Sequence, residues 1–99
     1  MKEIELVQHL INRVEPLYYG RKSETELNAI TGEARFTTKR LFGESSKYLD
    51  SLYEIRSSFP DWQPPLSVDE LHAWEEIWNS CKNKMLELFN AMLEELKQK

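Results

Sequence analysis

The feature that most constrains the fold of this chain is a run of seven apolar residues in its C-terminal third, spaced alternately by three and four positions. This spacing places successive side chains on one face of an α-helix. Sustained over three heptads, it forms the a/d seam through which helices pack on one another. A helix with such a seam needs neighbouring helices to cover it, so the pattern predicts a helical bundle. The seam consists of Leu71, Trp74, Trp78, Cys81, Met85, Leu88 and Met92.

The seam helix has a well-marked start. Pro60, Pro64 and Pro65 disfavour helix in the residues that precede them, so the chain turns in this stretch. Ser67 and Glu70 then form a capping box, in which each side chain satisfies a free backbone amide of the first turn. These signals predict a helix that begins at residue 67 or 68. Large apolar residues outside the seam indicate that it packs on more than one neighbour; they are Ile77, Leu86, Phe89, Leu93 and Leu96.

The N-terminal segment has helical spacing as well, which predicts a helix over residues 3 to 18. Pro16 would clash with the carbonyl four residues back in a continuing helix, so we expect a kink or an end near it. The apolar positions of this segment are Ile4, Val7, Ile11 and Val14.

The middle of the chain has the pattern of one long helix. Ser23 and Glu26 fit a second capping box, which predicts a helix start near residue 24. We favour a continuous helix from there to about residue 58, because a seven-residue apolar rhythm runs through the whole stretch. A break at Gly43 is the alternative, with Ser45 or Ser46 capping a new helix, since glycine costs about 1 kcal/mol relative to alanine in a helix interior. The rhythm comprises Leu27, Ala34, Leu41, Tyr48 and Ile55.

These patterns together predict an all-α fold. We expect a small antiparallel helical bundle with two long helices and one shorter N-terminal helix, or four helices if the middle one breaks at Gly43. Glycine is scarce, with three residues, and the two-residue alternation typical of strands is almost absent. At 99 residues, the chain 1–99 is expected to form a single domain.

The start of the chain and its cysteine content favour a cytoplasmic protein. The opening MKEIELVQHL has acidic residues within its first hydrophobic turn and lacks the uncharged apolar stretch of a signal peptide or membrane span. Cys81 is the single cysteine, so no disulfide can form within the chain.

Charge is distributed unevenly along the chain, whose net charge is −4. Residues 1–59 hold nine acidic and nine basic side chains, whereas residues 60–99 hold eight acidic side chains against four lysines. An acidic balance disfavours nucleic-acid binding, which depends on neutralising phosphates. We interpret the basic residues of the middle segment as a solvated face; they are Arg35, Lys39, Arg40 and Lys47.

The sequence contains none of the motifs that carry common enzyme chemistry: no glycine-rich phosphate loop, no nucleophile elbow and no paired-cysteine zinc spacing. Cys81 lies on the seam, and a buried apolar thiol is a poor nucleophile. Asp69, His72 and Glu76 have a helical metal-site spacing but face away from the seam, whereas bundle metal sites face inward. We therefore expect neither an enzyme nor a metal or cofactor site.

The prediction for function is a non-enzymatic protein-interaction module, a small regulator, inhibitor or adaptor, that acts through an acidic helical surface near the prolines. Trp74 and Trp78 lie on the seam and are assigned to the core. Trp62 lies in the proline loop, where it either plugs the end of the bundle or stands exposed as an interface anchor. The residues predicted to bind the protein partner are Trp62, Asp69, Glu75 and Glu76.

The alternative hypothesis is a homodimeric structural or assembly protein that pairs through the C-terminal heptad helix. It follows from the width of the apolar stripe, which is more than one short helix and half of one long helix would cover. The interface would then contain Met85, Leu88, Phe89, Met92 and Leu96. A metal-binding or nucleic-acid-binding helical protein is a lesser alternative, since the charge and orientation arguments oppose it.

Overall fold

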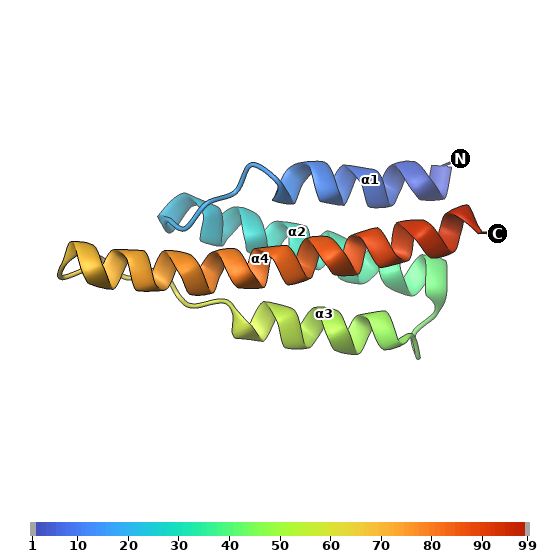
Figure 1. Cartoon of the computed structure of the whole chain (residues 1–99). Coiled ribbons are helices and arrows are strands. Elements are labelled where there is room, and N and C mark those ends of the chain that lie inside the picture. Colours follow the sequence, from blue (N-terminus) through green and yellow to red (C-terminus); the bar gives the residue numbers. More distant parts are fainter. Residues whose placement is uncertain (1, 99) are drawn as a thin grey trace.

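The computed structural model describes residues 2–98 and forms a bundle of four α-helices, with no strand among these residues. The helices are α1 (Lys2–Val14), α2 (Arg21–Phe42), α3 (Lys47–Ser58) and α4 (Val68–Lys97). Successive helices run in opposite directions (Figure 1). The predicted all-α antiparallel bundle is therefore confirmed, in its four-helix form. No helix within residues 2–98 has the length and apolar character that crossing a membrane would require.

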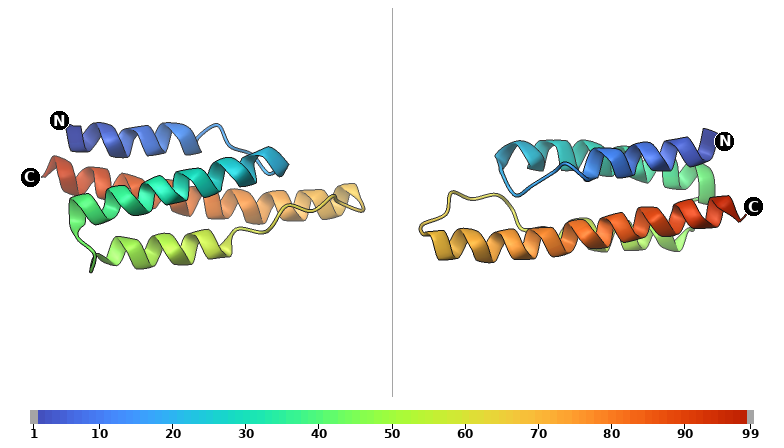
Figure 2. Two further views of the ribbon diagram at one scale, coloured as in Figure 1. Left: turned by 180° about the vertical axis from the view of Figure 1, so that it is seen from behind. Right: turned by 45° about the horizontal axis from the view of Figure 1, so that its top comes forward.

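The helices form a four-cornered bundle in which each helix has two neighbours. α1 packs against α2 and α4, and α3 packs against the same two helices, so that α1 and α3 occupy opposite corners. Figure 2 shows α2 and α3 side by side from behind, with α4 on the far side. The molecule measures 49 × 23 × 19 Å. Its length is set by α4, since 30 residues of helix span about 45 Å.

The core lies where the apolar faces of the four helices meet. Val7, Ile30, Met85, Phe89 and Met92 have no exposed surface, and each helix contributes at least one buried residue. The seam of α4 is buried from its third member onward, which confirms the seam as the core-facing stripe. The first two members, Leu71 and Trp74, are half-buried.

α1 ends at Val14, short of residue 18, so the helix has the end that was expected near Pro16. Pro16 accounts for the end, because its ring cannot follow the helical path and it has no N–H to donate. The ammonium group of Lys82 on α4 donates hydrogen bonds to the carbonyls of Glu15 and Leu17, at 2.6 and 2.8 Å. These bonds hold the connection after α1 against α4.

The predicted capping box at Ser23 is wrong. α2 begins at Arg21, so Ser23 lies inside the first turn and is buried. Its hydroxyl oxygen accepts a hydrogen bond from the backbone N–H of Tyr18, at 3.4 Å, and thus serves the connection between the helices. Glu26 does not cap the helix but forms an ion pair with Arg13 on α1, at 2.7 Å.

The favoured continuous helix from 24 to 58 is also wrong, because the chain breaks at Gly43. This residue has φ 93° and ψ 163°, a backbone conformation that is essentially restricted to glycine. Ser46 then caps α3, with its hydroxyl oxygen accepting from the backbone N–H of Tyr48 at 3.1 Å. The chain reverses at residues 43–46, so that α3 packs against α4. A continuous helix would instead have extended beyond the bundle.

The predicted start of the seam helix is confirmed. α4 begins at Val68, and the hydroxyl oxygen of Ser67 accepts from the backbone N–H of Glu70 at 3.1 Å. Asp69 and Glu70 lie in the first turn, where their negative charges interact favourably with the positive end of the helix dipole. Trp78 is assigned correctly to the core and packs edge-on against Phe59, with ring centroids 5.4 Å apart.

Candidate functional site

The first turns of α4 extend beyond the ends of the other three helices, with the loop of residues 59–67 beside them (Figures 1 and 2). We refer to residues 64–77 as the tip. Large apolar side chains are exposed here: Leu66 is 92% exposed, Val68 66% and Ile77 47%. Pro64 and Pro65 are exposed as well. Exposed apolar groups gathered at one end of a small protein are typical of an interaction site.

The loop that leads to the tip is fastened to the connection between α1 and α2. The Tyr19 hydroxyl donates to the Asp61 carbonyl and accepts from the backbone N–H of Gln63, both at 3.4 Å. The backbone N–H of Trp62 donates to the Glu24 carboxylate at 3.2 Å. These contacts fix the base of the tip on α2, so its apolar groups are presented from a supported loop.

Trp62 closes this end of the bundle. Its side chain is half-buried against the core, and the guanidinium of Arg21 lies over its ring, 5.4 Å from the ring centroid. A cation over an indole face is an attractive contact. Of the two roles considered for Trp62, the geometry corresponds to a plug at the end of the bundle. Only part of the ring is open to a partner.

The other three residues predicted to bind a partner lie on the first three turns of α4. Asp69 and Glu76 are exposed, and Glu75 is half-buried. Asp69 and Glu76 share the outward face of the helix with His72, as their spacing of three and four requires. Within residues 2–98, no group of three or more His, Cys, Asp or Glu side chains is arranged to hold a metal ion.

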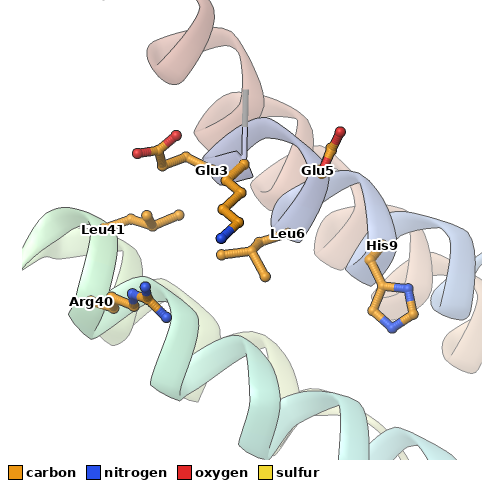
Figure 3. Close-up of a pocket in the computed structure, with 7 residues that line it drawn as sticks. Glu3, Glu5, Leu6, His9, Arg40 and Leu41 are labelled. Atoms are coloured by element: carbon orange, nitrogen blue, oxygen red, sulfur yellow. The ribbon is translucent and has the colours of Figure 1, made fainter.

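A hollow of about 540 Å³ in the surface lies between the start of α1 and the end of α2 (Figure 3). Its polar side chains include Glu5, His9 and Arg40, while Leu6 and Leu41 supply apolar surface. Figure 3 shows the charged ends spread around the rim without converging on one point.

Cys81 is the other group that could have carried chemistry, and it is buried. Burial raises the pKa of its thiol, against a smaller lowering effect of Lys84. The thiol donates a hydrogen bond to the Ser58 carbonyl at the end of α3, 3.3 Å away. The expected burial of Cys81 is therefore confirmed, and a buried thiol with a raised pKa is seldom ionised.

The residues assigned to a homodimer interface face the interior of the chain's own bundle. All five are between 0% and 9% exposed, and α1 and α3 pack against α4. A second copy could reach them only if the bundle opened. They are Met85, Leu88, Phe89, Met92 and Leu96.

Sequence reasoning missed two features of the surface. Leu66, Val68 and Ile77 carry the exposed apolar area of the tip. All three lie outside the seam, and Leu66 and Val68 closely follow a proline pair. The basic residues of α2 line two different hollows. Arg40 lines the hollow beside α1, whereas Arg35 and Lys39 line one beside α3.

Comparison of the chain with protein-family models, with curated proteins and with solved structures finds no match.

Proposed function

We propose that the protein is a non-enzymatic interaction module that binds a protein partner through its tip. The observation that carries the proposal is the exposure of Leu66 and Val68 beside the acidic first turns of α4. Leaving large apolar side chains in water costs free energy that a partner recovers by covering them. The acidic side chains around them favour a partner surface that is basic around an apolar centre.

The supported base of the tip favours this function as well. Because Tyr19 and Glu24 hold the loop on the bundle, the loop loses little conformational freedom when it binds. A small bundle with a rigid, partly apolar end has the properties of a regulator, inhibitor or adaptor.

The experiment is affinity capture with the tip altered in two separate ways. One bait carries Leu66→Ser with Val68→Ser, and the other carries Asp69→Asn with Glu76→Gln. All four side chains are exposed, so the fold is expected to survive, and a thermal melt checks this for each bait. The matched control is Phe36→Ser, which removes a 69% exposed aromatic ring on α2, away from the tip and outside the other surface hollow beside α3.

We expect a specific partner to bind the unaltered chain and the control, and to be lost from the apolar tip variant. The acidic variant is expected to bind it more weakly, with the larger loss at low ionic strength, where charges act most strongly. If every captured protein binds all four baits equally, the tip is not the recognition surface and the proposal fails.

A further inference from the structure

A second surface feature lies between α2 and α3, where a hollow of about 320 Å³ opens to solvent. We refer to it as the α2–α3 groove. Its α2 wall carries Arg35 and Lys39, and its α3 wall carries Tyr53 and Arg56. Leu49 and the Tyr53 ring supply apolar surface, while Leu52 lies buried beneath the groove. Helix α2 and helix α3 lie side by side along its length (Figure 2).

The groove is cationic although the chain is acidic. None of the described residues that line it is acidic, and none of Arg35, Lys39 and Arg56 forms a salt bridge within residues 2–98. Arg56 donates from Nε to the amide oxygen of Asn28 at 3.2 Å, a neutral acceptor that leaves its charge uncompensated. Three cations without a counter-charge in one groove form a local positive field.

The cations are strung along the groove. Arg56 lies level with Asn28 because the two are hydrogen-bonded, and Lys39 lies eleven positions further along α2. At 1.5 Å per residue this separation is about 16 Å, with Arg35 between the two ends. A single phosphate or carboxylate could not contact charges so far apart. The spacing suits an elongated occupant that carries several negative charges.

The apolar residues of the groove indicate further which class of ligand would bind there. The half-buried Leu49 lines the groove from α3, and the Tyr53 ring beside it is 76% exposed. An occupant that carries only charge, such as a sugar-phosphate backbone, would leave these two side chains without an apolar partner. An acidic protein segment with an apolar side chain among its carboxylates would contact the cations as well as Leu49 and Tyr53.

We propose that the α2–α3 groove binds an acidic segment of a partner protein. Carboxylates of the segment pair with Arg35, Lys39 and Arg56, and one apolar side chain of the segment packs on Leu49 against the ring of Tyr53. This site lies apart from the tip and has the opposite charge, so this proposal can be tested independently of the proposed function.

The test uses fluorescent synthetic peptides of about twelve residues, a length that spans the groove even in helical form. Each carries one Leu or Phe with Glu at three-residue and four-residue spacings, and a matched set has Gln in place of every Glu. A single-stranded oligonucleotide of similar length is the third probe. Binding to the full chain is measured by fluorescence anisotropy, and backbone amide NMR shifts locate it.

The variant Arg35→Glu with Arg56→Glu reverses two charges of the groove. Both side chains lie at the surface, and the carboxylate introduced on α2 would lie four positions before Lys39, a favourable helical spacing, so the fold is expected to remain. Lys22→Glu with Lys84→Glu is the matched control, since it makes the same change in net charge at exposed positions outside the groove.

We expect acidic peptides to bind the unaltered chain, with shifts centred on Arg35 and Tyr53, and the Gln peptides to bind about tenfold more weakly or not at all. The groove variant is expected to lose about tenfold in affinity, while the control stays within about twofold. The proposal is overturned if no acidic peptide binds better than its Gln match, or if the groove and control variants weaken binding equally. It is also overturned if the oligonucleotide binds the groove more tightly than the peptides, because the site would then be one for nucleic acid.

Discussion

The two parts of α4 carry the same spacing of apolar residues but have different surroundings. In the inner part, from Trp78 to the end of the helix, every seam residue is buried. In the outer part, residues 68–77, the seam residues Leu71 and Trp74 are half-buried, and Val68 and Ile77 are exposed. The inner part lies between α1 and α3, whereas the outer part extends beyond them. A seam therefore specifies a surface that can be covered, and the lengths of the neighbouring helices decide how much of it is covered.

The largest expected effect comes from truncating a side chain of the inner part. Phe89 has no exposed surface, so Phe89→Ala should lower the free energy of unfolding by about 3–5 kcal/mol through lost burial and a new cavity. Ile77→Ala in the outer part should lower it by less than about 1 kcal/mol, because this side chain is already 47% exposed. Urea unfolding of both variants measures the difference.

Phe89→Leu keeps the experiment informative if the alanine variant does not fold, since it should show a smaller loss of the same sign. Equal losses at residues 77 and 89 would contradict the comparison, because the outer part would then be as well covered as the inner part.

A smaller effect is expected at Gly43, where the chain reverses so that α3 covers the inner part of α4. Gly43→Ala should lower the free energy of unfolding by about 1–3 kcal/mol, because an alanine side chain disfavours the φ of 93°. A Cβ at this position would meet no atom within 4 Å, so the cost is conformational.

Gly32→Ala is the matched control and should have the opposite sign. Gly32 lies inside α2, is exposed and has free space around it, so alanine should raise the free energy of unfolding by about 0.5–1 kcal/mol. Thermal melts of both variants check the pair. If both substitutions stabilise the protein, residue 43 does not need its glycine conformation, and α2 and α3 can join.

The smallest effect concerns Cys81, which lies near the boundary between the two parts. Burial raises the pKa of its thiol in the folded chain, so as the pH rises the unfolded chain ionises first. The free energy of unfolding is therefore unaffected well below the ordinary thiol pKa of 9.0 and falls as the pH rises above it. Urea unfolding between neutral and alkaline pH should show this fall, and Cys81→Ala should reduce it.

Alkylation gives an independent check of the same thiol. Near neutral pH, iodoacetamide should modify Cys81 at least about tenfold more slowly in the folded chain than in urea, since the thiolate is the reactive form and the side chain is covered. Similar alkylation rates in the folded and unfolded chain would show that the helices packed on the inner part of α4 open readily at Cys81.

Local signals in the sequence predicted individual elements well where they were chemically specific. The proline stretch and Ser67 predicted the start of α4 correctly, because a cap and a chain turn depend on a few neighbouring residues. The seven-residue rhythm from Leu27 to Ile55 predicted the wrong continuity. Apolar spacing reports which residues face the core, and it persists across Gly43 because α2 and α3 both face that core.

The candidate site was predictable only in part. The acidic first turns of α4 are a local property, and residues 69 and 76 are exposed as predicted from their position off the seam. The plugging position of Trp62 depends on contacts of the loop with Tyr19, Arg21 and Glu24, which are distant in sequence. Such contacts leave no pattern in a single sequence.

The amino-acid sequence alone determined that the protein is helical, that a long C-terminal helix starts after the prolines, and which stripe of that helix faces inward. These properties follow from spacing and capping, which act between near neighbours. Only the tertiary structure decided that the middle segment folds back at Gly43, that the first turns of α4 stay uncovered, and that Arg35 and Arg56 line the same groove. Those outcomes depend on how the four helices differ in length and on which surfaces meet, and both are set by packing of the whole chain.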